Sequence, residues 1–110
     1  MKDNVVKDKS LEFAVRIVNL YKFLVNEQKE FVMSKQILRS GTSIGANIRE
    51  AEQAQSRADF INKLNIALKE ANETEYWLEL LIRTEYITRE QYESINNDST
   101  EINKLLISII

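Results

Sequence analysis

Apolar residues recur at intervals of three and four along most of the chain, which is the spacing of an amphipathic helix. The segment from Gln36 to Leu81 carries this pattern on more than one face, contains no proline and holds both glycines of the chain. A helix that is apolar on two faces has to be covered twice, once by its own chain and once by another copy. The pattern therefore predicts an all-α protein that associates with itself.

Polar breaks divide the chain into four predicted helices joined by short connections. Their expected bounds are about 10–26, 30–55, 57–85 and 88–109. The expected N-caps are Ser10, Ser56 and Thr88. Gln91, three residues after Thr88, completes a capping box. Short connections make neighbouring helices antiparallel, so residues 1–110 are predicted to form one domain, an antiparallel up-down-up-down four-helix bundle.

The first two predicted helices each carry an apolar stripe that is expected to face the core. In the first helix the stripe is Leu11, Ala14, Val18, Tyr21 and Val25, flanked by Ile17 and Leu24. In the second helix it is Ile37, Gly41, Ile44, Ile48, Ala51 and Gln55. Gly41 and Gly45 each cost up to about 1 kcal/mol relative to alanine inside a helix. Close approach of a neighbouring helix is expected to compensate, and a break or kink is the alternative.

The last two predicted helices have core stripes of the same kind. These are Ile61, Leu64, Leu68, Ala71, Glu75, Leu78 and Ile82 in the third helix, and Tyr92, Ile95, Ser99, Ile102, Leu106 and Ile109 in the fourth. Glu75 is the charged member of the third stripe. It is expected to lie where the bundle opens to water or to pair with a cation, because a buried unpaired charge is costly.

A second stripe on the third helix predicts a contact between subunits. Its members are Ile66, Glu73, Trp77 and Leu80. Trp77 is interpreted as a packing or interface anchor, since aromatic anchors are typical of interface centres; a ligand platform is the alternative. Glu73 needs a partner if it is buried, and we expect it to pair across the subunit contact with Arg39 or Arg49.

Two polar lines run along the second predicted helix. The basic line is Lys35, Arg39 and Arg49, with Arg57 just beyond the helix end. It is either a solvated face paired with glutamates of the third helix or a set of phosphate contacts, because the arginine fork fits phosphate oxygens. The other line is Ser40, Ser43, Asn47 and Glu50. Ser43, Asn47 and Glu50, together with Glu73, are candidates for a buried polar network, with ligand binding as the alternative.

Composition narrows the chemistry. The 110 residues contain no histidine and no cysteine, which removes the commonest general base, the commonest metal ligand and thiol chemistry. No phosphate loop, nucleotide fingerprint or nucleophile–base pair is found. The chain is therefore predicted to be a non-enzyme with no cofactor, metal or small-molecule substrate. A metal site built from carboxylates alone is the remaining enzymatic alternative.

The charge is unevenly distributed. Residues 1–57 hold 10 Lys/Arg and 7 Asp/Glu, a balance of +3, whereas residues 58–110 hold 5 and 10, a balance of −5. The two halves either form ordinary solvated faces, or the basic face of one subunit contacts the acidic face of the next. The polar N-terminal residues predict no secretion signal, and no run of about 18 apolar residues predicts a membrane span. A cytoplasmic location without membrane contact is the default expectation.

The segment RSGTSIGANIREA resembles the signature of a bacterial family first noticed as proteins encoded in intervening sequences of 23S ribosomal RNA genes, the "S23 ribosomal protein" family. The matching residues are Arg39, Ser43-Ile44, Asn47-Ile48-Arg49-Glu50, Asp59-Phe60, Ile66-Ala67 and Glu73. The resemblance covers about residues 10–110. It departs from the family at Ala51 and Lys69-Glu70, where the family often has Gly and Gly-Ser.

The resemblance implies a four-helix bundle that assembles as a homopentameric ring. It also implies kinship with the accessory protein of diversity-generating retroelements, which associates with a reverse transcriptase and nucleic acid. Those nucleic-acid-binding relatives are markedly basic, whereas this chain has a net charge of −2. The leading expectation is a homo-oligomeric helical scaffold or adaptor that binds other macromolecules. The alternative is an RNA- or nucleoprotein-associated module that uses the basic line.

Overall fold

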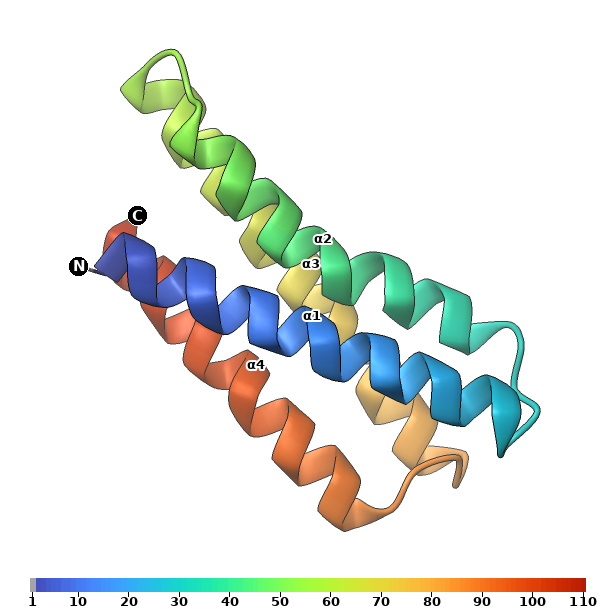
Figure 1. Cartoon of the computed structure of the whole chain (residues 1–110). Coiled ribbons are helices and arrows are strands. Elements are labelled where there is room, and N and C mark those ends of the chain that lie inside the picture. Colours follow the sequence, from blue (N-terminus) through green and yellow to red (C-terminus); the bar gives the residue numbers. More distant parts are fainter. Residues whose placement is uncertain (1) are drawn as a thin grey trace.

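Four helices make up almost the whole computed structural model, which describes the backbone of residues 2–110 and the side chains of residues 5–110. They are α1 (Lys2–Asn26), α2 (Met33–Glu52), α3 (Arg57–Arg83) and α4 (Arg89–Ile109). Successive helices run antiparallel, and α1 packs on both α2 and α4, as α3 does (Figure 1). Helices α1 and α3 are thus diagonal partners, and the predicted all-α four-helix bundle is confirmed for the part of the chain described.

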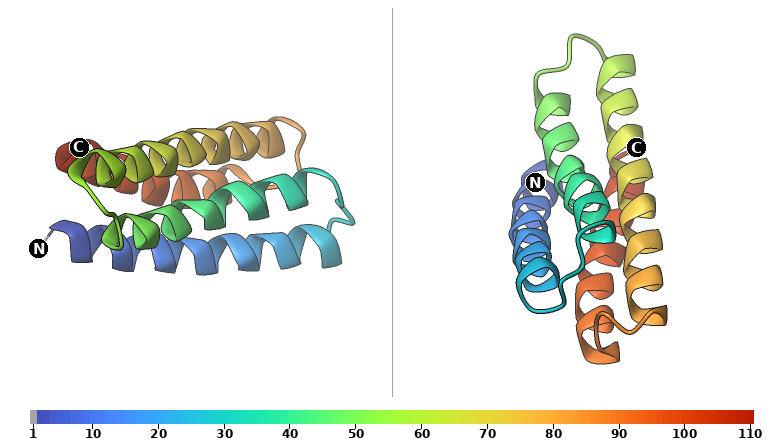
Figure 2. Two further views of the ribbon diagram at one scale, coloured as in Figure 1. Left: turned by 90° about the horizontal axis from the view of Figure 1, so that it is seen from above. Right: turned by 90° about the vertical axis from the view of Figure 1, so that its right-hand side faces the viewer.

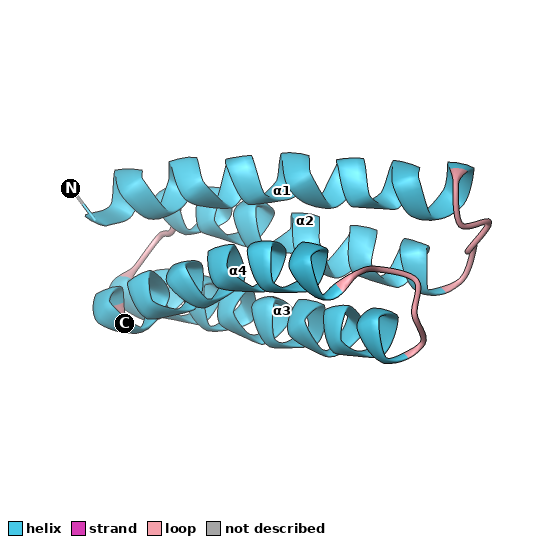
Figure 3. Ribbon diagram, turned by 90° about the horizontal axis from the view of Figure 1, so that it is seen from below, coloured by secondary structure: helices cyan, strands magenta, loops and turns pink. Residues whose placement is uncertain are grey.

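The bundle is elongated, with its connections at two ends. The chain termini and the α2–α3 connection lie at one end, and the α1–α2 and α3–α4 connections lie together at the other (Figures 2 and 3). At that second end the side-chain amide of Gln28 donates a 2.9 Å hydrogen bond to the carbonyl oxygen of Tyr86. The two connections there are therefore in direct contact.

Helix α1 begins earlier than the sequence pattern indicated. It includes Lys2, and Ser10, the predicted N-cap, lies inside it with 1% of its surface exposed. The Ser10 hydroxyl donates to the carbonyl oxygen of Lys7 at 2.9 Å. The N-cap prediction was wrong because Val6, which is 1% exposed, extends the buried face of the helix through the polar start of the chain.

The face of α1 that fills the core also differs from the prediction. The buried apolar residues are Val6, Phe13, Ile17, Leu20 and Leu24. The predicted stripe lies beside them: Leu11 is half exposed, and Ala14, Val18, Tyr21 and Val25 are partly buried. The helix therefore has two apolar faces, and the face with the larger side chains Phe13 and Leu20 enters the core. The other face is left at the surface.

Helix α2 is continuous through both of its glycines and is shorter than predicted at each end. All the predicted core positions from Ile37 to Ala51 are buried, whereas Gln55 lies outside the helix. A Cβ atom at Gly41 would lie 2.7 Å from Cγ1 of Ile17. Close approach of α1, rather than a kink, therefore explains the glycine at position 41.

The side chain of Glu30 caps the N-terminus of α2, which the sequence pattern did not reveal. Its carboxylate accepts hydrogen bonds from the backbone N–H groups of Val32, Met33 and Ser34, at 3.2, 3.0 and 2.7 Å. Burial of the carboxyl raises its pKa, but these backbone donors outweigh that effect and hold the pKa of Glu30 below its ordinary value. The side chain satisfies N–H groups that a helix start otherwise leaves without partners.

The predicted caps of α3 and α4 are confirmed. Ser56 Oγ accepts from the N–H of Asp59 at 3.1 Å. Thr88 Oγ1 accepts from the N–H of Gln91 at 3.1 Å, and Gln91 Oε1 accepts from the N–H of Thr88 at 2.8 Å. These reciprocal bonds complete the capping box and fix where α4 begins.

Candidate functional site

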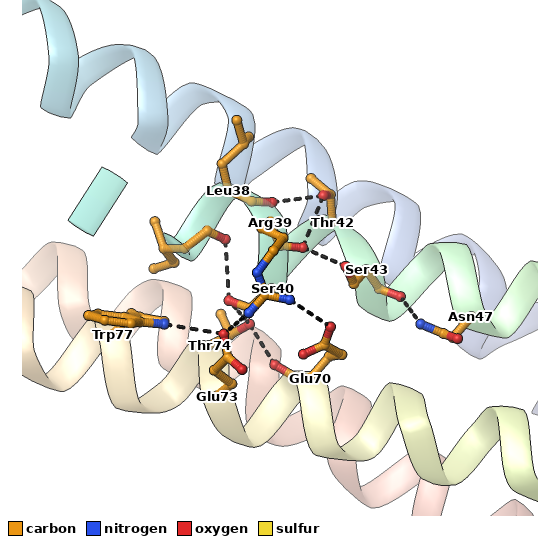
Figure 4. Close-up of polar contacts among 11 residues, drawn as sticks. Leu38, Arg39, Ser40, Thr42, Ser43, Asn47, Glu70, Glu73, Thr74 and Trp77 are labelled. Atoms are coloured by element: carbon orange, nitrogen blue, oxygen red, sulfur yellow. Dashed lines mark hydrogen bonds and ion pairs between the residues drawn. The ribbon is translucent and has the colours of Figure 1, made fainter. Parts of the chain in front are cut away.

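The outer side of the α2–α3 contact is held by a charged cluster. Arg39 of α2 forms ion pairs with Glu70 of α3, at 3.1 Å, and with Glu73 (Figure 4). The hydrogen bond that Arg39 donates to Glu73 and the negative charges of Glu70 and Glu73 raise the pKa of Arg39. Arg39 was one of the two partners expected for Glu73, but the pair lies within one chain. The expectation that it crosses a subunit contact is therefore corrected.

Trp77 joins this cluster from the apolar side. Its indole N–H donates to Glu73 Oε2 at 3.4 Å, and its ring packs partly against the core (Figure 4). Tyr76 meets Trp77 edge to face, with ring centroids 5.0 Å apart, and is 58% exposed. Ile66 and Leu80 lie along the same side of α3, both partly exposed. We call Ile66, Tyr76, Trp77 and Leu80 the α3 patch.

The second apolar face of α1 forms another surface beside α2. Lys7 pairs with Glu52 of α2 at 3.1 Å, and Leu11 and Val18 follow Lys7 on the same side of the helix. Leu11 is 50% and Val15 54% exposed. We call Leu11, Val15 and Val18 the α1 patch. Sequence reasoning found Leu11 and Val18 but assigned them to the core.

The opposite side of α1 carries charged residues that pair with α4. Lys9 pairs with Glu101 at 2.7 Å, and Arg16 pairs with Asp98 at 2.8 Å. The hydrogen bond and negative charge of Glu101 raise the pKa of Lys9. Apolar side chains therefore lie at the surface on the α2 side of α1, whereas two ion pairs connect its opposite side to α4.

The four cations of the predicted basic line have different environments in the structure. Arg39 is engaged with glutamates of α3, as one of the two interpretations expected. Lys35 and Arg49 are exposed on α2 and form no ion pair with any side chain of residues 5–110. The guanidinium of Arg57 lies 5.2 Å from the centre of the Phe60 ring, in a cation–π contact. Two of the four cations thus remain unengaged on the outer side of α2.

The four residues predicted to form a polar network are not joined into one. Ser43 Oγ donates to the carbonyl oxygen of Arg39 at 2.6 Å, and Asn47 donates to that of Ser43 at 2.9 Å (Figure 4). Glu50 pairs instead with Lys63 at 3.6 Å. Short polar side chains within a helix commonly bond to a carbonyl four residues earlier. That local option accounts for the failure of the network prediction.

The buried polar link between α2 and α3 involves Ser40 and Thr74, and sequence reasoning missed Thr74. Their hydroxyl oxygens are 3.0 Å apart, and both side chains are fully buried. Thr74 Oγ1 also lies 2.8 Å from the carbonyl oxygen of Glu70, to which it donates. The signal was available, because Thr74 falls at core spacing between Ala71 and Leu78.

Glu75 is held by neutral partners from α4. Its Oε1 accepts from Ser99 Oγ at 3.3 Å and from the side-chain amide of Asn103 at 3.1 Å. Glu75 is partly exposed, as the expected opening to water requires, and no cation among the side chains of residues 5–110 pairs with it. Among the side chains of residues 5–110, no group of three or more acidic residues is arranged to hold a metal ion.

The fold and its surface define an antiparallel four-helix-bundle protein that presents an apolar patch on each of two diagonal helices. The family model described as "23S rRNA-intervening sequence protein" matches residues 2–108, and the chain belongs to this family. The resemblance found in the sequence is thereby confirmed.

A solved structure supports the same assignment. The chain is 98% identical to a protein of unknown function from the S23 ribosomal protein family of Bacteroides thetaiotaomicron VPI-5482, with a TM-score of 0.97. The similarity covers 100% of this chain and 95% of that one. The comparison with curated proteins gave no match. Within residues 2–110, none of the helices combines the length and the apolar character needed to cross a membrane.

Proposed function

We propose that this chain is a non-enzymatic scaffold in which the α1 patch of one subunit binds the α3 patch of the next. The observation that carries the proposal is the presence of two partly exposed apolar patches on different helices of one subunit. Exposed apolar patches on a protein surface mark interaction sites. A contact between two different patches is heterologous, and repeated heterologous contacts produce a ring or an open filament.

The positions of the patches favour a ring. The Lys7–Glu52 pair places the α1 patch beside α2, and the Arg39–Glu73 pair places the α3 patch beside α2 as well. The two patches therefore lie on neighbouring sides of the bundle that meet at α2, not on opposite sides. Joining neighbouring sides turns each subunit relative to the last, which favours a closed ring over a straight filament. Five subunits is the number that the family resemblance implies.

The charge distribution agrees with the same joint. Residues 1–57, which contain α1 and α2, have a balance of +3, and residues 58–110 have a balance of −5. A contact between an α1 surface and an α3 surface brings halves of opposite sign together. Electrostatic complementarity of this kind favours the correct partner and orientation.

Two single substitutions and their mixture test this joint. Leu11→Glu removes the α1 patch and Leu80→Glu removes the α3 patch, so each variant should have a smaller solution mass than the wild type. A mixture of the two should form a larger species again, because each variant retains the patch that the other lacks. Ile107→Glu is the matched control, since Ile107 is 63% exposed on α4 and belongs to neither patch. Wild-type mass for both variants, measured by light scattering after size-exclusion chromatography, would reject the proposed joint.

Association with RNA or a nucleoprotein is the second candidate function, and exposed cations that lack ion pairs favour it. A ring would repeat Lys35 and Arg49 once per subunit and so gather a larger basic surface. Fluorescence anisotropy with labelled structured ribosomal RNA at about 50 and 200 mM salt measures this, because phosphate contacts weaken steeply over that range. Arg49→Glu should reduce both affinity and salt dependence, whereas Lys104→Glu on α4 should not. Equal affinities of Arg49→Glu and wild type would exclude Arg49 from an RNA site.

A further inference from the structure

An apolar tip projects from the α1–α2 connection, at the end of the bundle away from the termini. Phe31 and Val32 are 52% and 72% exposed. They follow Glu30, whose carboxylate binds the N–H groups of Val32 and Met33. The tip is therefore fixed to the start of α2 by hydrogen bonds. A short segment that is both apolar and held in place is suited to docking, because little conformational entropy is lost when it binds.

A groove opens beside this tip. One part, about 460 Å³ in volume, lies along the α3–α4 connection, and a second part of about 270 Å³ lies between α1 and α4. Phe23 and Gln91 line both parts, which therefore lie next to each other. The apolar lining consists of Leu20, Phe23, Ile82, Ile87 and Ile95. The groove thus combines apolar and polar side chains at the same end of the molecule as an apolar projection.

The charges around the two features are complementary. The tip is flanked by Glu27 and Lys29, and the groove contains Glu85 and Arg89. None of these four forms an ion pair with any side chain of residues 5–110. Each feature therefore carries one unengaged charge of each sign beside its apolar residues.

We propose that the tip of one copy docks in the groove of a second copy, with the two copies related by a two-fold axis. Tip and groove lie at the same end, so two copies meeting at that end place each tip against the other's groove. This is an isologous contact, in which the same pair of surfaces is used twice and the assembly closes. Glu27 then faces Arg89 of the second copy. The contact is independent of the proposed ring and, where the ring forms, joins two rings through their ends.

The solution masses of four variants, each compared with the wild type, distinguish the tip contact from the contact that forms the ring. Val32→Asp should halve the wild-type mass, and Leu80→Glu should leave a dimer held by its tips. The double variant should be a monomer. Ile107→Asp, at an exposed apolar position at the opposite end, should keep the wild-type mass. A Val32→Asp mass equal to that of the wild type would overturn the tip contact, whatever Leu80→Glu does; an unchanged Leu80→Glu mass would reject only the ring.

A charge exchange identifies the occupant of the groove as a second copy. Glu27→Arg and Arg89→Glu should each weaken association, raising the protein concentration at half-assembly about tenfold. The double variant restores opposite charges across the two-fold contact and should return that concentration to near the wild-type value. Circular dichroism confirms that each variant remains folded. Failure of the double variant to recover association would exclude the Glu27–Arg89 pairing and overturn this mode of docking.

Discussion

Gly41 of α2 lies directly against Ile17 of α1, so that a Cβ atom at position 41 would be 2.7 Å from Cγ1 and 2.8 Å from Cγ2 of Ile17. Ile17 is fully buried and has little room to move in a close-packed interior. Gly45, one turn later, is less constrained, since a Cβ atom there would lie 3.3 Å from Ser10 Oγ. The two glycines of one helix therefore serve its packing unequally.

This difference predicts opposite outcomes for the same substitution. Gly41→Ala should lower the free energy of unfolding by up to about 2 kcal/mol, because overpacking costs about 1–3 kcal/mol and the gain in helix propensity is only about 1 kcal/mol. Gly45→Ala should be neutral or stabilising by up to about 1 kcal/mol. Urea midpoints at fixed protein concentration measure both, and equal effects of the two substitutions would contradict the packing argument.

The buried hydroxyl pair Ser40–Thr74 predicts a non-additive pair of substitutions. Thr74→Val keeps the side-chain shape but leaves Ser40 without its partner on α3, which should cost about 1–2 kcal/mol. Adding Ser40→Ala removes the stranded hydroxyl and should recover part of that loss. Thr42→Val is the control, since Thr42 Oγ1 donates only to carbonyl oxygens of its own helix. If the destabilisation of the double variant equals the sum of the two single effects, the interaction energy is zero and the two hydroxyls are not coupled.

The carboxylate of Glu30 makes stability depend on pH. Its folded-state pKa lies below the ordinary value, so its contribution is complete above the unfolded-state pKa of about 4.3 and is lost as pH falls through the folded-state pKa. Glu30→Gln should therefore be less stable than the wild type at pH 7, by about 1–2 kcal/mol. The difference should shrink below about pH 4. Urea unfolding from pH 7 to pH 3 tests this, with Glu93→Gln, an exposed and unpaired site on α4, as control.

The sequence predicted the helices well because their stripes and caps are local signals. The capping box of Thr88 and Gln91 involves residues three apart and was found directly. The core face of α1 was misassigned because that helix has two apolar faces, and only packing against α2 and α4 selects the one with Phe13. Glu30 was missed because its role depends on a turn in the connection, not on a repeating pattern.

The candidate site was less predictable for a related reason. Position along α2 placed Arg39 near α3, but its pairing with Glu70 and Glu73 depends on how the two helices are rotated against each other. Ser43 and Asn47 had a local alternative in the carbonyl groups of their own helix, which helical spacing does not exclude. Contacts between helices therefore required the structure.

Helix α3 ends in a backbone conformation that glutamate fits poorly. The N–H groups of Tyr86 and Glu85 donate to the carbonyl oxygens of Leu81 and Ile82, at 2.9 and 3.0 Å, which is the pattern of a Schellman motif. Glu85 has φ of 66°, in the left-handed region that glycine adopts without strain. This position is the one that most often carries glycine at the end of a helix.

Glu85→Gly should therefore stabilise the protein by a few tenths of a kcal/mol up to about 1 kcal/mol. The relief of about 1–2 kcal/mol of left-handed strain exceeds the added flexibility of the unfolded glycine, about 0.5–1 kcal/mol. Lys69→Gly, at an exposed interior position of α3, should instead lose about 1 kcal/mol. Thermal midpoints at one protein concentration compare the two. Because glycine costs stability at Lys69 and relieves strain at Glu85, midpoint shifts of opposite sign are expected, and a lower midpoint for Glu85→Gly would refute the strain argument.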